Sequence, residues 1–306
     1  MSPVRSVQYR SPLAYLRAAI SRRLLRFVLA GRDAQTLPMH VVVPGDEVSD
    51  EMLLAGIHEG ALLEPLFKHF LQPFHARFAT GVALDVGANI GNHSLYFSRF
   101  FPRVLSVEPN PVTLNVLRAN AALSGADVTV LPMGFGNANG SLQFWSNRAG
   151  NLGASGFAFA DGPTGERNGQ SIECPIRRGD EVLAELSAGP VALIKLDVEG
   201  AELSALQGLG ECLRRDQPLV IFECLKAAGE GGGDAIFAYL RERGYDRFFV
   251  VESSVSAARR PVGGWLRRLL QGERVALRAV DKPVEGEPWL MVLALPVGAV
   301  QPVGAA

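Results

Sequence analysis

The chain has 306 residues, of which 48% are hydrophobic and 20% charged, a composition typical of a soluble globular protein with a sizeable core. Its formal net charge of −1 gives no overall attraction to polyanions, and we expect no nucleic-acid partner. The three cysteines form no CxxC pair and no zinc spacing, which indicates buried thiols in a reducing compartment.

The first 32 residues carry seven arginines and no acidic residue. Apolar residues recur at helical spacing over 13–28, with arginines on much of the other face. Such a helix is compatible with contact to an anionic membrane surface, although packing on its own domain is the commoner arrangement. The same arginines interrupt any signal-like stretch, and no apolar run is long enough to span a membrane. We therefore expect a cytoplasmic protein, with peripheral membrane contact left open.

Residues 1–80 are predicted to form a helical N-terminal extension and cap, with one short strand at 39–44. From residue 82 onward, short apolar runs alternate with helical segments, which is the pattern of crossover units and a parallel sheet. The predicted strands are "VALDV", "VLSVE", "VTVLP", "VALIKLDV", "LVIFEC" and "YDRFFVVE". The predicted fold is therefore α/β and doubly wound, with helices on both faces of a mostly parallel sheet.

Three stretches of the 81–306 domain depart from this alternation. Residues 134–178 contain two strand-like runs around a Gly/Ala/Ser-rich stretch, and we expect an inserted hairpin or loop near the carboxyl edge of the sheet. Residues 253–287 form a second insertion, in which 264–280 is basic and amphipathic and is interpreted as a second basic helix. The run "PWLMVLALP" at 288–296 is predicted to be a final strand, inserted antiparallel beside its predecessor.

The turn "DVGANIG" links the first strand of this domain to a helix, and Gly87 and Gly91 bracket it. Glycine allows backbone torsions and close approaches that a side chain would block. The first strand-to-helix turn of an open parallel sheet is also where nucleotide-like ligands bind. The spacing is neither the G-x-G-x-x-G of pyrophosphate binders nor a P-loop. The turn thus favours a ligand with an adenosine and no pyrophosphate, and a plain tight connection is the alternative.

Acidic residues stand at the ends of four predicted strands. Glu108 lies 23 residues after Asp85, near the separation at which an acid accepts hydrogen bonds from both ribose hydroxyls. Asp197 ends "LIKLD", where Lys195 shares its face of the strand and is predicted to be buried with a partner. Glu223 stands near the end of "LVIFEC". The carboxyl ends of parallel strands meet at one edge of a sheet, so we expect these four acids on one rim.

Four segments in this order, "LDVGANIGNHSLYFS", "VEPNPVTLNVLRANAAL", "KLDVEGAELSALQGL" and "PLVIFEC", resemble S-adenosylmethionine-dependent methyltransferases of the FkbM type. The likeness covers residues 82–225 well and 40–252 loosely. It implies the class I methyltransferase fold, a Rossmann-like sheet of seven strands with an antiparallel last strand. It also implies S-adenosyl-L-methionine as cofactor and O-methylation of a hydroxyl on a saccharide, glycolipid or secondary metabolite.

The resemblance implies roles for individual residues on the cofactor side. Asp85 anchors the methionine end of the cofactor, and Glu108 holds its ribose. Met133 and Gly134 border the adenine, although "VLPMGFGN" lacks the acid that class I enzymes commonly have after the third strand. The remaining residues of the predicted cofactor site lie in and beside the two turns: Gly87, Ala88, Asn89, Gly91, Asn92, His93, Pro109 and Asn110.

Methyl transfer to a hydroxyl requires a proton acceptor near the reacting oxygen. Asp197 is the first candidate, with Lys195 orienting it; the reserves are Glu199, Glu223 and His93. Glu202 is interpreted instead as an acid that favours the helix N-terminus. Asp197, Glu199 and Glu223 would also suit a divalent ion, but strand-end acids need not converge and we predict no metal.

Other functions fit part of this pattern. A non-catalytic protein would keep the adenosyl pocket and dock on a membrane or partner through its basic helices. A nucleic-acid methyltransferase is less suitable, because the fourth strand ends in D-V-E-G rather than an N-P-P-Y type motif. An NAD dehydrogenase fits the acid for the ribose but not the glycine spacing. The sequence predicts neither the methyl acceptor nor the oligomeric state.

Overall fold

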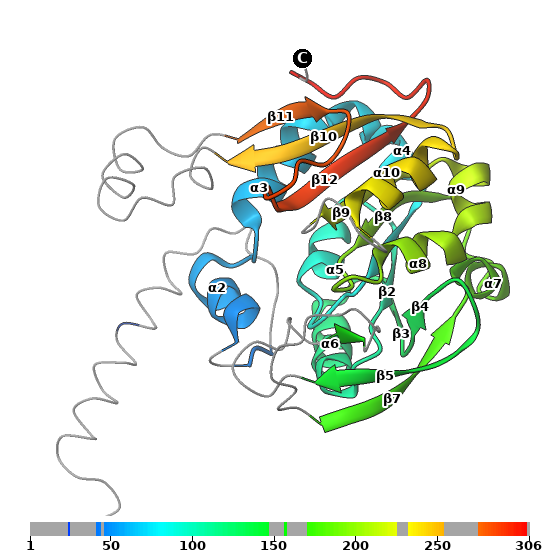
Figure 1. The fold of residues 1–306 in the computed structure, drawn as a ribbon. Helices are drawn as coiled ribbons and strands as arrows, with labels where there is room; N and C mark the ends of the chain where they lie inside the picture. The colour runs from blue at the N-terminus through cyan, green and yellow to red at the C-terminus, as the bar shows by residue number, and fades with distance from the viewer. Residues whose placement is uncertain are drawn as a thin grey trace, which may run out of the picture.

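Eight strands form the central sheet of the computed structural model, in the order β11-β10-β12-β9-β8-β1-β2-β3 (Figure 1). The structure describes residues 24, 41–43, 46–146, 156–157, 170–224, 232–253 and 275–304. In chain order the strands are β1 (Val82–Val86), β2 (Arg103–Val107), β3 (Val128–Leu131), β8 (Val191–Leu196), β9 (Leu219–Cys224), β10 (Tyr245–Ser253), β11 (Val275–Val280) and β12 (Trp289–Pro296).

Five neighbouring strands of this sheet, β3, β2, β1, β8 and β9, are parallel. Strand β12 lies between β9 and β10 and is antiparallel to both. The mostly parallel sheet and its antiparallel last strand are thus confirmed. The expected number of seven strands is wrong, because β11 adds an eighth at the edge, antiparallel to β10. Part of the segment interpreted as a basic helix is therefore a strand. Its residues alternate, with Leu277 in the core and Arg278 paired with Glu252 outside, which is the period of a strand.

Helices cover both faces of this sheet, as predicted for a doubly wound fold (Figure 1). Successive strand residues point to opposite faces, so Leu84 packs in one core cluster with Phe237 and Ala83 packs in the other with Phe67. The helices of the crossovers are α5 (Asn92–Phe97), α6 (Pro111–Ser124), α7 (Gly179–Glu185), α8 (Glu202–Gly208), α9 (Gly210–Asp216) and α10 (Gly233–Arg241). No helix in the described ranges is both long and apolar enough to cross a bilayer.

The N-terminal part of the chain contributes to the core. Its elements are α2 (Glu47–Ala55), α3 (Gly60–Pro65), a π-helical turn η1 (Leu66–Phe70), a 3-10 turn η2 (Gln72–Phe74) and α4 (His75–Phe78). Phe67 and Phe78 are fully buried in the cluster that also contains Tyr96 of α5. The predicted domain boundary at residue 80 stays a prediction. The predicted helix over 13–28 lies outside the described residues apart from Leu24, as does 264–274 of the second basic segment.

The strand predicted at 39–44 is wrong at 41–43, which have no regular structure, and residues 39, 40 and 44 lie outside the described residues. The backbone of Val41 bonds to a side chain instead of a neighbouring strand. Asn120 of α6 accepts from the backbone N–H of Val41 at 2.9 Å and donates to its carbonyl at 3.0 Å. The same amide donates to the carbonyl of Ile90, in the turn after β1, at 2.9 Å. One buried asparagine thus ties the N-terminal segment to the glycine turn.

The inserted region after β3 forms a second sheet in the order β4-β7-β5-β6. Its strands are β4 (Gly134–Phe135), β5 (Gly140–Ser146), β6 (Gly156–Phe157) and β7 (Gln170–Arg177). The thiol of Cys174 in β7 donates to the carbonyl of Pro109, just beyond the carboxyl end of β2, at 3.3 Å. This contact places the insertion beside the carboxyl edge of the main sheet, where it was predicted.

Replacing Asn120 with alanine removes three hydrogen bonds and leaves buried backbone groups unpaired. We expect the free energy of unfolding to fall by about 2–3 kcal/mol, measured by urea denaturation. Asn115→Ala, at an exposed position of the same helix, is the control and should change it by less than about 0.5 kcal/mol. Equal midpoints for the two variants would contradict a structural role for the Asn120 amide.

Candidate active site

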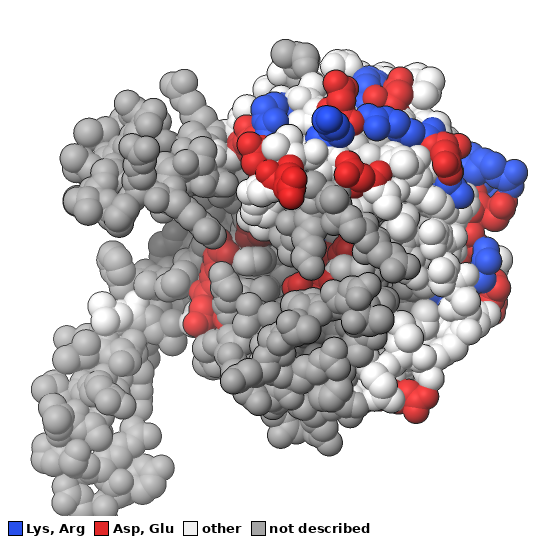
Figure 2. Space-filling view, viewed as in Figure 1, with Lys and Arg blue, Asp and Glu red and all other residues white. Residues whose placement is uncertain are grey.

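Four neighbouring strands bring the four predicted acids to one edge of the sheet. Asp85 and Glu223 lie near the ends of β1 and β9, and Glu108 and Asp197 follow β2 and β8. Because these strands are adjacent and parallel, their carboxyl ends form a continuous rim. In the space-filling view, acidic side chains line the central hollow, and the lysine and arginine side chains lie mostly along the upper right of this face (Figure 2).

Gly87 holds the turn after β1 against the end of β8. Its φ is +83°, and a Cβ at this position would lie 1.8 Å from the carbonyl oxygen of Asp197. The N–H of Asp197 also donates to the carbonyl of Val86 at 3.0 Å. Gly91, with a φ of +101°, precedes α5 as its N-cap residue. Glycine is thus required at position 87 because the two backbones approach closely, and at position 91 because the backbone is left-handed there.

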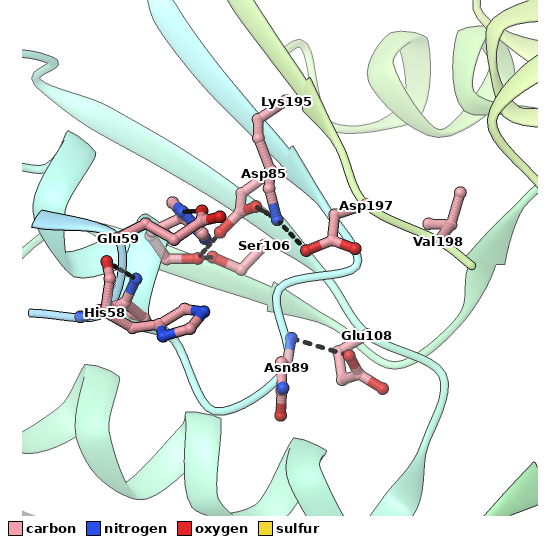
Figure 3. Close-up of polar contacts among 12 residues, drawn as sticks. His58, Glu59, Asp85, Asn89, Ser106, Glu108, Lys195, Asp197 and Val198 are labelled. Carbon is pink, nitrogen blue, oxygen red and sulfur yellow. Dashed lines mark hydrogen bonds and ion pairs between the residues drawn. The ribbon is translucent and has the colours of Figure 1, made fainter. Parts of the chain in front are cut away.

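The carboxylate of Glu108 is buried and is held by two backbone N–H groups. Its Oε2 accepts from Asn89 and its Oε1 from Asn110, each at 2.8 Å (Figure 3). Burial raises the pKa of Glu108 to about 7, although both backbone bonds and a bond from the Thr113 side chain favour the charged form. A carboxylate has about four acceptor positions, so the group can still accept from a ligand hydroxyl.

Lys195 links two of the strand-end acids. Its ammonium lies 3.1 Å from Asp197 Oδ2 and 3.7 Å from Asp85 Oδ1, and the three side chains converge (Figure 3). Burial alone would lower the pKa of Lys195, but the carboxylates of Asp197 and Asp85 raise it above its ordinary value. Asp85 also accepts from Ser94 at 2.6 Å, and Ser94 accepts from Ser106 at 2.7 Å. The prediction of a buried lysine with a partner is confirmed.

Unpaired polar atoms gather along the same edge. Asp85 Oδ1, Asn89 Oδ1 and Asn110 Nδ2 are buried and have no hydrogen-bond partner, and in the described part of the chain only Trp289 Nε1 shares this state. Asp85 Oδ1 has only the ion pair with Lys195 at 3.7 Å. A buried polar group without a partner costs about 1–3 kcal/mol. Three such groups beside one turn are suited to a polar ligand that would pair with them.

Other residues of the predicted cofactor side follow the same edge towards β3. The N–H of Ala88 donates to the carbonyl of Val107 at 3.0 Å. Met133, half-buried, packs against the core just after β3, and Gly134 begins β4. The side chain of Asn92 is engaged elsewhere, because it exchanges hydrogen bonds of 3.0 and 3.1 Å with the backbone of His58. Its predicted cofactor contact stays a prediction.

A small cavity beside Lys195 forms the other half of the site. Its volume is about 30 Å3, room for one or two water molecules. The polar residues lining it are Glu59, His93, Lys195, Asp197 and Glu223, and its apolar residues include Leu290 and Met291 of β12. Glu59 bonds to Nε2 of His93 at 3.1 Å. Sequence reasoning missed Glu59, because no periodicity or motif marks an acid that precedes a six-residue helix.

The acids around this cavity differ in charge state. Burial opposes the charged form of Glu59, but its bond to His93 lowers the pKa of Glu59 to about 2. Burial and the neighbouring Asp197 carboxylate raise the pKa of Glu223 to about 8. Glu199 is exposed and does not line the cavity. Glu202 accepts from the N–H groups of Val198 and Gly200 at 3.2 Å each, which supports its interpretation as a helix N-terminal acid.

The described residues contain no group of three or more histidine, cysteine, aspartate or glutamate side chains placed to hold a metal ion. The carboxylates of Asp197, Glu199 and Glu223 are therefore not gathered as a set of ligands.

Comparison with known proteins assigns the domain that carries this edge. Residues 85–247, more than half of the chain, match the methyltransferase FkbM domain. The chain belongs to the FkbM methyltransferase family. The matched range contains all four strand-end acids and the glycine turn, whereas Glu59 lies outside it.

Curated relatives of the FkbM domain include "Methyltransferase sdnD" of Sordaria araneosa, 33% identical over 42% of this chain and 60% of that protein. "Hexuronic acid methyltransferase AglP" of Haloferax volcanii is 29% identical over 44% of this chain and 52% of that protein. "AMB antimetabolite synthetase AmbE" of Pseudomonas aeruginosa is 28% identical over 54% of this chain but only 9% of its own length. The chain therefore spans less than two thirds of each of these relatives.

Among solved structures, the methyltransferase FkbM of Methylobacillus flagellatus matches with 16% identity and a TM-score of 0.40 over 91% of this chain and 60% of that one. Such a TM-score carries no structural argument, and the family assignment rests on the match of the FkbM domain.

Replacing Lys195 with methionine leaves the fully buried carboxylate of Asp85 without its cation. We expect the free energy of unfolding to fall by about 3–5 kcal/mol, measured by denaturant unfolding of the FkbM protein. Adding Asp85→Asn should restore part of the loss, because no buried charge then lacks a partner. Lys282→Met, at an exposed position, is the matched control; a similar loss in that variant would contradict the role of the buried ion pair.

Proposed function

We propose that the protein is an S-adenosylmethionine-dependent methyltransferase that methylates a hydroxyl of a saccharide, glycolipid or secondary metabolite. The observation that carries this proposal is the pairing of Glu108 with the glycine turn on adjacent strands. A buried carboxylate with free lone pairs suits the vicinal hydroxyls of a ribose. The turn beside it lacks the N–H-rich loop of pyrophosphate binders, which favours an adenosyl group over a dinucleotide.

The unpaired atoms of the site fit the rest of this cofactor. Asp85 Oδ1 and Asn89 Oδ1, at the turn, are both acceptors and would pair with the ammonium of its methionine end. Asn110 lies beside Glu108 and would contact the ribose. Met133 and Gly134 supply an apolar border for the adenine ring. These assignments retain the roles expected from the family resemblance.

The cofactor, when bound, supplies a methyl group that is already activated on a sulfonium, so the protein's task is alignment, exclusion of water and removal of the hydroxyl proton. Asp197 was the first candidate for that removal. Its carboxylate is already engaged, however, because Lys195 lies 3.1 Å from it. Glu223 lines the same cavity with a pKa raised to about 8, near the operating pH of a general base. We therefore assign the role of general base to Glu223, with Lys195 and Asp197 positioning the methyl acceptor.

Among the three acceptor classes, two observations favour a saccharide hydroxyl. One relative is named as a hexuronic acid methyltransferase. The rim of the cavity also joins acids to the exposed Leu290, and a sugar ring lying across that rim would present hydroxyl edges and an apolar face to them. Membrane contact through 13–28, the cytoplasmic location and the absence of a nucleic-acid partner stay predictions.

Glu108→Ala should weaken binding of S-adenosylmethionine by about 100-fold or more, because two hydrogen bonds to a charged group are lost. Isothermal titration calorimetry measures this, with S-adenosylhomocysteine as a second ligand that carries the same ribose and should lose as much. Glu285→Ala, at an exposed position, is the control and should bind normally. Unchanged affinity in the Glu108 variant, with normal thermal unfolding, would remove Glu108 from the cofactor site.

Protein incubated with methyl-labelled S-adenosylmethionine and carbohydrate and lipid extracts should transfer label to a product whose new methyl lies on oxygen by mass spectrometry. Glu223→Gln should lower transfer by about 10²–10⁴-fold while the cofactor still binds. Asp197→Asn keeps an oxygen for Lys195 and should lose less. Cofactor binding without transfer into any fraction would instead support the non-catalytic adenosyl-binding protein.

A further inference from the structure

The cavity of the candidate active site holds more carboxylates than it has cations to pair with them. Glu59, Asp197 and Glu223 line it together with Lys195 and His93. His93 bonds to Glu59 at 3.1 Å, and Lys195 is shared between Asp197 and the buried Asp85. Glu223 has neither an ion pair nor a hydrogen bond to any residue in the described ranges. It is the surplus acid of the site.

The elements around Glu223 contribute mainly further acids. Asp197 and Glu199 face it from the end of β8, Glu202 from the first turn of α8, and Glu59 from the N-terminal segment. Lys195 is the lysine of the same cavity and is engaged by Asp197, and the His93 ring is engaged by Glu59. In the close-up the carboxylate of Glu59 points towards Lys195 and Asp85 (Figure 3). Adjacent like charges with partial burial favour the protonated form of Glu223 near neutral pH.

The methyl donor and its product differ by one positive charge, on the sulfur atom. In the proposed binding mode this sulfur would lie near Glu223. A sulfonium is a permanent cation, and the thioether left after transfer is neutral. A cation within a few ångströms favours the ionised form of a carboxyl group. In a partly buried site the effect is larger than in water, because screening is weaker. Glu223 would therefore encounter two different electrostatic environments with the two forms of the cofactor.

We propose that Glu223 responds to the charge of the cofactor: it gives up its proton when the sulfonium form binds and keeps it when the thioether product binds. The inference rests on the proposed function and deepens it, because it makes the proton acceptor available only when a methyl donor is present. The proton leaves to solvent on binding. In the transfer, the bond from sulfur to the methyl carbon breaks as the bond from the acceptor oxygen forms, and the hydroxyl proton passes to Glu223. The thioether and Glu223 are then both neutral.

Calorimetry without any acceptor tests this proposal. S-adenosylmethionine and S-adenosylhomocysteine are titrated at pH 7.5 in buffers of different ionisation enthalpy, which gives the number of protons released by each. From the pKa of about 8, we expect about 0.7 proton more to be released by S-adenosylmethionine. Protons exchanged by Glu108 cancel in this difference, because both ligands carry the ribose. Equal release by the two ligands would overturn the inference and leave the proposed function intact.

Glu223→Gln identifies the group that releases the proton. This variant should bind both ligands, and the difference between them should fall by about 0.7 proton. Ionisations of the ligands themselves are the same for the two proteins and cancel in this comparison. Glu285→Gln, at an exposed position that does not line the cavity, is the control and should keep the difference. A difference as large in Glu223→Gln as in the wild type would overturn the assignment.

Two further results separate the inference from the function on which it rests. If Glu223→Gln does not fold, the wild-type affinity ratio of the two ligands decides. Affinity for S-adenosylmethionine relative to the product should rise about 20-fold from pH 6.5 to 8.5. A ratio independent of pH would overturn the inference. Failure of the wild-type protein to bind either ligand would defeat the proposed function, and the inference with it.

Discussion

The close contact between the ends of β1 and β8 is the constraint on which this active site depends. Gly87 lies so near the carbonyl of Asp197 that any side chain would separate the two strands. The N–H of Asp197 completes the contact by bonding to the carbonyl of Val86. Because of this approach, Asp85 and Asp197 reach the same lysine, and the turn after β1 lies within reach of the Glu108 carboxylate.

The charges of the site contribute more to arrangement than to stability. A buried ion pair such as Lys195 and Asp85 gives little net stabilisation, because removing both charges from water costs about as much as their attraction returns. What it supplies is a fixed position for each group at the edge of the sheet. The unpaired Asn89 and Asn110 atoms also add nothing to stability. Proteins depart from full hydrogen bonding mainly at functional sites.

The N-terminal segment completes a site that the FkbM domain alone leaves open. Two asparagines of the domain, Asn92 and Asn120, each exchange hydrogen bonds with its backbone, at His58 and Val41. These bonds hold Glu59 beside His93. An acid from outside the family match therefore sets part of the charge of the cavity.

The sequence by itself determined the parallel sheet, the glycine turn and the common edge of Asp85, Glu108, Asp197 and Glu223. These follow from local patterns and one topological rule, that parallel strands joined by crossovers end on the same side. Only the tertiary structure decided that Lys195 pairs with two acids, that Glu59 joins the cavity, that 275–280 is a strand, and that Glu223 lacks a cation. The pairings and the cavity depend on groups far apart in the sequence, whose distances and burial are set by packing. The segment 275–280 has the alternation of a strand, and its place at the edge of the sheet depends on pairing with β10.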